Sequence, residues 1–265
     1  MSLVLASSWL TMAIAGLGIG FLVGCTGVGA GALTTPMLVG GFGVPPAVAV
    51  GTDLLFAAIT KATGAWRHHR LGNVDWAVLG WLAAGSLAAS LAVLAWLYLG
   101  APDTTRLAVT IKRGLSVALV ASAIAIPLYP LLRRAPSAEG EAPPRRLRPL
   151  ATLTLGLVLG GLVTLTSVGA GAIGVVALCA LYPSLLARSI VGTDVVHAVP
   201  LTMLSGLGHL GLGHVDLGVL AAMLAGSIPG IALGSRLTGC LPDWSLRLAL
   251  SLVLLGAAWM LLAKA

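Results

Sequence analysis

The chain has 265 residues, of which 58% are hydrophobic and only 9% are charged. Soluble domains carry about 25% charged residues, so this composition excludes a water-soluble protein and predicts one that crosses a lipid bilayer several times. Five of the fifteen Lys and Arg residues fall in the short segment 133–148, so the net charge of +7 indicates a cytoplasmic loop rather than a nucleic-acid partner.

The first apolar block, residues 9–42, is too long for one simple helix. Four glycines lie in its centre, at 24–31, and Pro36 follows. Glycine at this density weakens a helix, so we predict two short helical segments that meet at a glycine-rich break. Residues 1–20 contain no Lys or Arg, so we interpret them as part of a retained helix rather than a cleaved signal peptide.

The next helix is predicted to begin at Pro46 and to end near Trp66. A polar loop at 67–73 separates it from a span at 76–99, and a further span is expected at 111–132. Asp75 and Asp216 each precede an apolar run and are predicted to be helix N-caps.

The second half of the chain repeats the first at an offset of 140 or 141 residues. Residues 26–33 correspond to 166–173, and the Gly-Thr-Asp motif at 51–53 returns at 192–194. A duplication of this kind is the usual architecture of secondary transporters. We therefore predict an all-α, polytopic membrane protein with a first repeat at 1–132, a cytoplasmic basic linker at 133–149 and a second repeat at 150–265.

The distribution of Arg predicts how the repeats are oriented. The loop 67–73 contains two Arg, whereas the equivalent loop 208–214 contains no Lys or Arg. Equivalent loops of different charge are expected on opposite sides of the membrane. The prediction is thus two inverted repeats of about five hydrophobic segments each, with glycine-broken helices. If each broken block crossed only once, the repeats would instead be parallel.

Asp53 and Asp194 are expected to lie at membrane depth. A carboxylate there costs roughly 2.5–3.5 kcal/mol on insertion scales, so such a residue is functional by default. A low-dielectric surrounding favours the neutral form of a carboxylate, which suits reversible protonation. His68 shares a helix face with Asp53, and His209 shares one with Asp194, so all four residues are candidates for proton coupling. A structural hydrogen-bonding role for the two carboxylates is the alternative.

The two glycine-rich breaks are the predicted substrate site. Backbone N–H groups freed at a break, together with the positive end of a short helix, suit an anion. Tight helix packing is the alternative role for these glycines. The predicted substrate-binding residues are Thr26, Gly27, Gly29 and Gly31 in the first break, Thr166, Ser167, Gly169 and Gly171 in the second, and Thr52 and Thr193 in the Gly-Thr-Asp motifs.

Lys61 breaks the symmetry between the repeats, because its equivalent is Thr202. Its ammonium group could neutralise Asp53 or attract an anionic substrate, and we include it among the substrate-binding residues. Extension of the side chain to the membrane surface is the alternative.

The glycine-rich break, the sequence Pro-Pro-Ala-Val-Ala-Val-Gly-Thr at 45–52 and the Gly-Asn-Val-Asp-Trp segment at 72–76 resemble the TauE/SafE sulfite-exporter family of bacterial membrane proteins. The resemblance extends over essentially the whole chain and includes the second copy. It implies transport of a sulfur-containing anion such as sulfite, sulfoacetate or another organosulfonate. Family members often have Ser at the position of Asp53, so the coupling role rests on this chain's own residues.

These observations predict a proton-coupled secondary transporter in the bacterial inner membrane, with a small anion and the lipid bilayer as its partners. A passive anion channel is one alternative. An intramembrane aspartyl protease is a weaker one, because a protease needs two carboxylates in one asymmetric cleft. We expect no metal, no cofactor and no nucleic-acid partner, and a homodimer is one option for the assembly.

Overall fold

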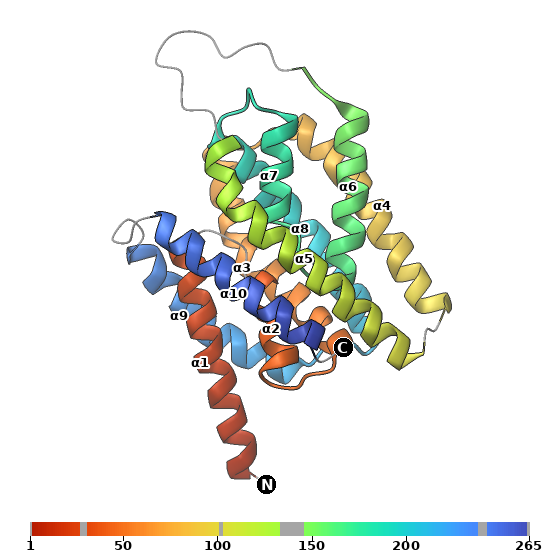
Figure 1. Ribbon diagram of the computed structural model, residues 1–265, viewed down its shortest axis with the longest axis vertical. Helices are drawn as coiled ribbons and strands as arrows, with labels where there is room; N and C mark the ends of the chain where they lie inside the picture. Colours follow the sequence, from red (N-terminus) through yellow and green to blue (C-terminus); the bar gives the residue numbers. More distant parts are fainter. Residues whose placement is uncertain (1, 27–30, 101–102, 133–145, 238–242, 264–265) are drawn as a thin grey trace.

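The computed structural model describes residues 2–26, 31–100, 103–132, 146–237 and 243–263 (Figure 1). These residues form α-helices and contain no strand, which confirms the predicted all-α class. The helices are α1 (Ser2–Thr26), α2 (Gly31–Gly40), α3 (Pro46–Arg70), α4 (Trp76–Gly100), α5 (Thr104–Leu132), α6 (Pro149–Thr166), α7 (Ala172–Leu181), α8 (Ala187–Gly211), α9 (Leu217–Leu237) and α10 (Asp243–Ala263).

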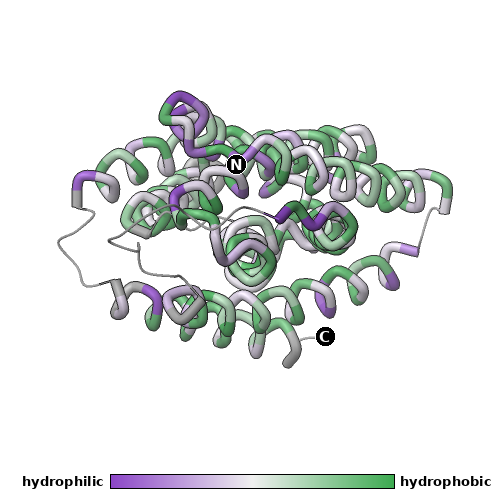
Figure 2. The backbone as a smooth tube through the Cα atoms, turned by 90° about the horizontal axis from the view of Figure 1, so that it is seen from above, coloured by the Kyte–Doolittle hydropathy of each residue, from purple (hydrophilic) through white to green (hydrophobic). Residues whose placement is uncertain are grey.

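Six of these helices, α3, α4, α5, α6, α8 and α9, are long and apolar enough to cross a membrane. Hydrophobic residues occupy most of the length of the helices, and α5 and α10 form one outer layer of the bundle (Figure 2). Helix α5 begins at Thr104 rather than near 111 as predicted. It therefore includes Lys112 and Arg113, which lie inside the helix and not at its end.

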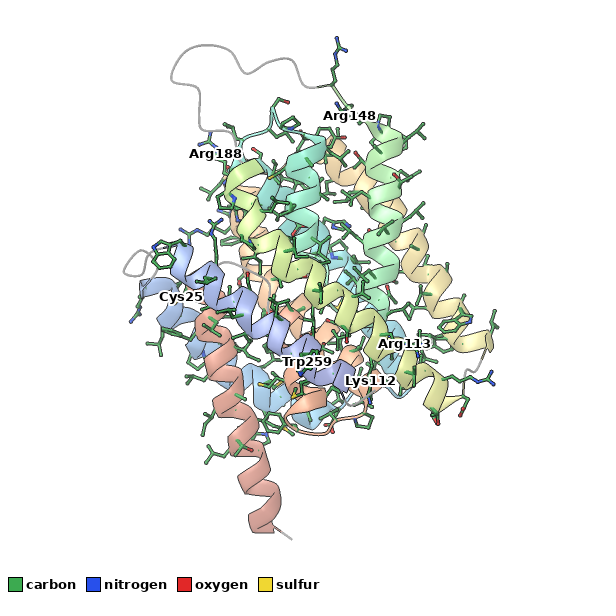
Figure 3. All side chains as sticks on the ribbon, in the orientation of Figure 1. Cys25, Lys112, Arg113, Arg148, Arg188 and Trp259 are labelled. Atoms are coloured by element: carbon green, nitrogen blue, oxygen red, sulfur yellow. The ribbon has the colours of Figure 1, made fainter. Side chains whose placement is uncertain are left out.

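The two repeats, α1–α5 and α6–α10, are inverted. Helix α1 rises from the foot of the molecule in Figure 1, whereas its equivalent α6 descends from the top, and α5 and α10 also run in opposite directions. Figure 3 places Arg148 and Arg188 at one end of the bundle, and Lys112 and Arg113 toward the other. Arg67 and Arg70, at the end of α3, lie at the same end as Arg188 because α3 and α8 are antiparallel neighbours.

The repeats interlock instead of forming separate lobes. Helix α1 packs along α9, and by symmetry α6 packs along α4, while α3 pairs with α8 and α5 with α10. Small residues allow these helices to approach closely. A Cβ atom added at Gly20 would lie 2.3 Å from the Ser227 carbonyl oxygen, and one at Gly160 would lie 2.1 Å from the Ser86 carbonyl oxygen. Bulkier residues would push either pair apart.

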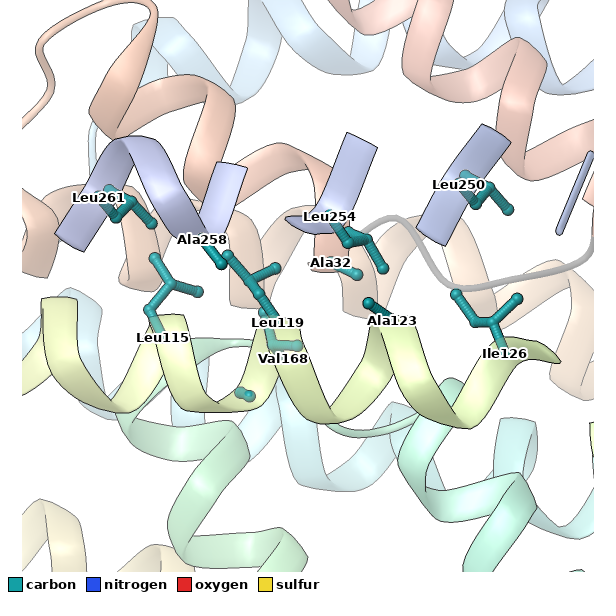
Figure 4. Close-up of a cluster of buried hydrophobic side chains, with 11 residues drawn as sticks. Ala32, Leu115, Leu119, Ala123, Ile126, Val168, Leu250, Leu254, Ala258 and Leu261 are labelled. Carbon is teal, nitrogen blue, oxygen red and sulfur yellow. The ribbon is translucent and has the colours of Figure 1, made fainter. Parts of the chain in front are cut away.

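The pairing of α5 with α10 builds a hydrophobic wall behind the two breaks (Figure 4). Leu115 and Leu119 of α5 face Leu254 and Ala258 of α10 in one buried cluster. Ala32, at the start of α2, and Val168, in the second break, belong to the same cluster. The start of α2 and the second break are thus supported from behind by this hydrophobic cluster.

The short helices α2 and α7 have ten residues each. They are about 15 Å long, half of the ~30 Å hydrocarbon core of a bilayer. Each broken block therefore enters the bundle on one helix and returns from near its middle on a shorter one. The outer helix of the first block is longer than predicted, because α1 has 25 residues.

Candidate functional site

The Gly-Thr-Asp motifs hold the two repeats together. A Cβ atom at Gly51 would lie 1.9 Å from the His214 carbonyl oxygen, and one at Gly192 would lie 2.0 Å from the Asn73 carbonyl oxygen. Only glycine permits this approach, because any other residue would place its side chain on the opposing backbone. Gly51 thus contacts the loop before α9, and Gly192 contacts the loop before α4.

The threonines of the motifs form hydrogen bonds to the same two loops. The Thr52 hydroxyl accepts a hydrogen bond from the Asp216 N–H at 3.0 Å, and the Thr193 hydroxyl accepts one from the Asp75 N–H at 2.9 Å. The predicted substrate-binding residues Thr52 and Thr193 therefore lie at the inter-repeat contacts. Both are buried, with 1% of their surface exposed.

Asp75 and Asp216 cap the helices that follow them, as predicted. The Asp75 carboxylate accepts from the Val78 N–H at 3.1 Å, and the Asp216 carboxylate accepts from the Val219 N–H at 3.0 Å. The same two residues thus cap α4 and α9 with their side chains and join the repeats with their backbones.

Asp53 is fully buried beside the first turn of α2. Its Oδ2 atom accepts a hydrogen bond from the Thr35 hydroxyl at 2.6 Å, and the side chains of Ser167 and Thr34 also interact with the carboxylate. A Cβ atom at Gly31 would lie 3.5 Å from Oδ2. The carboxylate therefore occupies the positive end of a short helix.

Asp194 occupies the equivalent position beside α7, but without a side-chain hydrogen bond within the described residues. It is fully buried, and the backbone N–H of Gly171 interacts with its carboxylate. Its Oδ1 atom lies so near Gly174 that a Cβ atom there would be 2.2 Å away. Thr34 and Thr35 of the first repeat are replaced by Gly174 and Val175 in the second. The two carboxylates are therefore equivalent in place and different in hydrogen bonding.

The start of α2 meets the second break inside the bundle. A Cβ atom at Gly31 would lie 2.5 Å from the Ser167 carbonyl oxygen, so the start of α2 touches the second break. Ser167 adopts a left-handed conformation with φ of 60°, and its buried hydroxyl lies beside the Asp53 carboxylate. Gly169 and Gly171 have φ of 132° and 120°, which a side chain would disfavour.

Not all of the predicted break residues can be placed. Gly27 and Gly29 lie outside the described residues, and so does the side chain of Thr26. The Thr166 hydroxyl donates to the Leu162 carbonyl at 2.7 Å and accepts from the Val168 N–H at 3.2 Å. Thr166 therefore stabilises the end of α6, whereas the Ser167 hydroxyl lies beside Asp53.

Lys61 lies in the middle of α3 and reaches the second break. Its Nζ atom donates a hydrogen bond to the Ala170 carbonyl oxygen at 3.1 Å, and the ammonium group interacts electrostatically with both Asp53 and Asp194. The equivalent Thr202 hydroxyl instead donates to the Ala198 carbonyl of its own helix at 2.8 Å. The Lys61 ammonium therefore interacts with both buried carboxylates.

The register of α3 against α8 gives the depth of each group. Gly51 lies near His209, and Gly192 lies near His68, so the two helices are antiparallel along their whole length. In this register Asp53 and Asp194 are separated by about 13 residues, or about 20 Å, along the helix axes. Lys61 lies between them, near the pseudo-twofold axis. The carboxylates flank the centre of the bundle, one toward each end.

The predicted relay histidines occupy different surroundings. His68 is half-buried and lies at the end of α3 beside Gly192. His209 is buried, and its Nε2 atom donates to the Thr164 carbonyl oxygen at 3.0 Å.

The sequence interpretation did not include His197 among the site residues, and this residue is fully buried with its Nε2 atom 2.7 Å from the Ser86 hydroxyl. The interpretation did not include Thr35 either. His197 lies three residues after Asp194 on the same helix, and this spacing was the available signal.

An inverted-repeat helical bundle with broken helices and buried ionisable groups at its centre defines the class of polytopic membrane transporters. The profile of the sulfite exporter TauE/SafE family matches residues 12–261. The chain belongs to the TauE/SafE family.

Curated relatives agree with this assignment. The chain is 36% identical over 225 residues to the probable membrane transporter protein YjnA of Bacillus subtilis, which covers 84% of this chain and 87% of YjnA. It is 26% identical over 245 residues to the probable membrane transporter protein YdhB of the same organism, over 88% of this chain and 92% of YdhB. No solved structure matches the chain.

Proposed function

We propose that the protein is a proton-coupled secondary transporter that moves a small sulfur-containing anion, such as sulfite, sulfoacetate or another organosulfonate, across the bacterial inner membrane. The observation that carries this proposal is the arrangement of one ammonium group, Lys61, between two buried carboxylates, Asp53 and Asp194. Each carboxylate lies at the start of a half-length helix.

The groups near the second break suit a tetrahedral or pyramidal oxyanion. The Lys61 ammonium supplies a positive charge, and the buried Ser167 hydroxyl, beside Asp53, supplies a donor. The positive ends of α2 and α7 add to the attraction. An anion that binds here approaches the carboxylates, so its binding is favoured when a carboxylate is protonated. Repulsion between the anion and an ionised carboxylate therefore couples binding of the substrate to protonation of that carboxylate.

The charge distribution gives the orientation. Arg67, Arg70, Arg148 and Arg188 lie at one end of the bundle, and we assign that end to the cytoplasm by the positive-inside rule. Asp194 then lies toward the cytoplasmic side, and Asp53 toward the outer side.

The alternatives predict different behaviour. A passive channel would conduct an anion down its gradient but would not accumulate it. A protease needs two carboxylates that share a proton at about 3 Å, whereas Asp53 and Asp194 are about 20 Å apart along the helices. We therefore retain the channel as the second candidate.

The test is transport by the purified protein in liposomes. Uptake of sulfite, sulfoacetate, taurine and sulfate is measured with and without an imposed pH gradient, against protein-free liposomes. Accumulation of one sulfur anion above its external concentration, abolished by a protonophore, is the expected result. Flux that only dissipates an anion gradient would favour the channel, and absence of flux for all four compounds would contradict the proposed substrate class.

A further inference from the structure

A cluster of oxygen atoms surrounds the Asp53 carboxylate. The Thr35 hydroxyl donates to Asp53 Oδ2 at 2.6 Å, and the side chains of Thr34 and Ser167 also interact with the carboxylate. Asp53, Thr34 and Thr35 have no exposed surface, and Ser167 is only 6% exposed. Three hydroxyl groups thus face one carboxylate inside the bundle. We call these four residues the Asp53 cluster.

A backbone oxygen joins the cluster from the second break. Ser167 ends α6 in a left-handed conformation, with φ of 60°. The position of a Cβ atom at Gly31 is 2.5 Å from the Ser167 carbonyl oxygen and 3.5 Å from Asp53 Oδ2. Both oxygens therefore lie within 3.5 Å of one point, where glycine places no side chain. The C-terminal end of a helix carries partial negative charge, and unwound backbone carbonyls at such ends coordinate sodium in secondary transporters.

The second repeat lacks these hydroxyl groups. At the offset of 140 residues, Gly174, Val175 and Gly27 stand where the three hydroxyl residues of the Asp53 cluster stand. Asp194 is nevertheless fully buried at the equivalent place, so the fold holds a carboxylate there without the three hydroxyls. Buried polar groups cost free energy unless they are bonded. The hydroxyls therefore indicate a role that belongs to the Asp53 carboxylate alone.

The Asp53 carboxylate also has a weaker counter-charge than Asp194. The Lys61 ammonium interacts with both carboxylates, and more strongly with Asp194. Among the described residues, Lys61 is the charged group that acts on Asp53. Hydroxyl groups solvate a carboxylate but do not neutralise it, and a buried charge without a close partner of opposite sign is costly. The ionised form of Asp53 is therefore stabilised by a further cation in its cluster.

We propose that the Asp53 cluster is a binding site for a sodium ion. Its donors are a carboxylate, hydroxyl oxygens and a backbone carbonyl, and hard oxygen ligands of this kind select hard cations. Each hydroxyl that donates to the carboxylate still has lone pairs that face a cation. One carboxylate balances a monovalent ion, whereas a divalent ion would leave an excess charge in a buried place. The close approach of the oxygens favours sodium over the larger potassium ion.

A sodium ion and a proton are alternative partners that neutralise Asp53. Either one removes the repulsion between this carboxylate and a substrate anion, so a sodium gradient is a second driving force for transport. The role of sodium in transport rests on the function proposed above, whereas its binding needs neither the anion nor a proton gradient.

Binding of radioactive sodium to the purified full-length protein in detergent tests the site. Scintillation proximity, measured without any transported anion and with choline keeping the ionic strength constant, gives the dissociation constant. We expect saturable binding that unlabelled sodium displaces and potassium does not. Absence of saturable binding would overturn the site, and equal displacement by potassium would overturn its assignment to sodium.

Variants of the cluster locate the ion. Asp53→Asn should abolish the binding, and Thr35→Val, which keeps the shape of the side chain and removes the hydroxyl, should weaken it about 10–100-fold. Thr34→Val is the second variant, in case Thr35→Val lowers the yield of folded protein. Thr202→Val is the matched control, because Thr202 is also buried and its hydroxyl donates within its own helix.

The control should bind sodium with the wild-type dissociation constant, and each value is referred to monodisperse protein after size-exclusion chromatography. Wild-type affinity in Asp53→Asn would overturn the site. The sodium site and the proposed transport fail separately. Absence of flux in the liposome test would leave sodium binding intact, and proton-driven uptake by a protein that binds no sodium would remove the sodium site alone.

Discussion

The Lys61 ammonium donates a hydrogen bond to the Ala170 carbonyl oxygen at 3.1 Å, and so connects the centre of the first repeat to the break of the second. No symmetrical bond exists within the described residues, because Thr202 stands at the equivalent position and bonds within its own helix. Within the part of the chain that the structure describes, the duplicated fold therefore has a cation at position 61 and none at the equivalent position 202. This asymmetry makes Lys61 the most direct test of where the anion binds.

Lys61→Gln should raise the KM for the transported anion about tenfold or more, because it removes the charge that attracts the substrate. Lys61→Arg should retain most of the affinity. Thr202→Val is the matched control at the equivalent position and should change KM little. Measurement of initial uptake against anion concentration gives all three values, and an unchanged KM in Lys61→Gln would place the anion elsewhere.

Asp53→Asn and Asp194→Asn should each abolish accumulation driven by a pH gradient while leaving anion exchange between the two sides. In the wild type, anion binding is favoured by protonation of a nearby carboxylate, so uptake should rise as the external pH falls. An amide cannot titrate, so the variants should lose this dependence. Uptake assays across a pH series decide the matter, and a wild-type pH profile in both variants would assign the carboxylates a structural role.

Gly51→Ala and Gly192→Ala should destabilise the protein by about 1–3 kcal/mol or more, because the added methyl group meets the backbone of the opposing loop. The expected Cβ positions lie 1.9 Å and 2.0 Å from carbonyl oxygens. Gly80→Ala is the control, since nothing lies within 4 Å of its added Cβ atom. Thermal unfolding of the detergent-solubilised protein compares the three, and equal midpoints would contradict the close contact.

Cysteine probes at Leu71 and Leu212 should be labelled from opposite sides of the membrane, because these residues end the antiparallel helices α3 and α8. The background should lack Cys25, Cys179 and Cys240, of which the first two are buried. Labelling of intact cells with an impermeant maleimide should modify the Leu212 probe first. Modification of both probes from one side would exclude inverted repeats.

Gly171→Ala should impair transport more than Gly161→Ala. Gly171 has a φ of 120° at the start of α7, a sparsely populated backbone conformation that costs a side chain about 1–3 kcal/mol, whereas a Cβ atom at Gly161 meets nothing within 4 Å. Uptake per folded molecule, measured after size-exclusion chromatography, separates lost activity from lost protein. Equal activity in the two variants would show that the second break tolerates a changed backbone.

Much of the fold could be predicted because the determinants are local. Asp75 and Asp216 were recognised as caps from the residue type and the apolar run that follows. The inverted repeats followed from a constant offset and from the position of Arg. The start of α5 was misplaced because Lys112 and Arg113 interrupt the apolar pattern without interrupting the helix.

The candidate site could be predicted only in part, because its contacts join residues far apart in the sequence. Asp53 and Asp194 were identified from the free-energy cost of a carboxylate at membrane depth. The hydrogen bond from Thr35 to Asp53 and the close approach of Gly174 to Asp194 depend on where the short helices α2 and α7 lie. Thr52 and Thr193 were assigned to substrate because nothing in the motif shows that the other repeat's loop lies against them. Gly27 and Gly29 remain predictions.

The pairing of α1 with α9 has a consequence for how the protein is made. Gly20 contacts Ser227, so about 200 residues must be synthesised before α1 meets its partner, which takes roughly 10–40 s at 5–20 residues per second. During that time α1 is in lipid with its small-residue face uncovered. We expect the nascent first half to need a chaperone or the insertion machinery at this face, and a truncated chain that stops before α9 to be degraded.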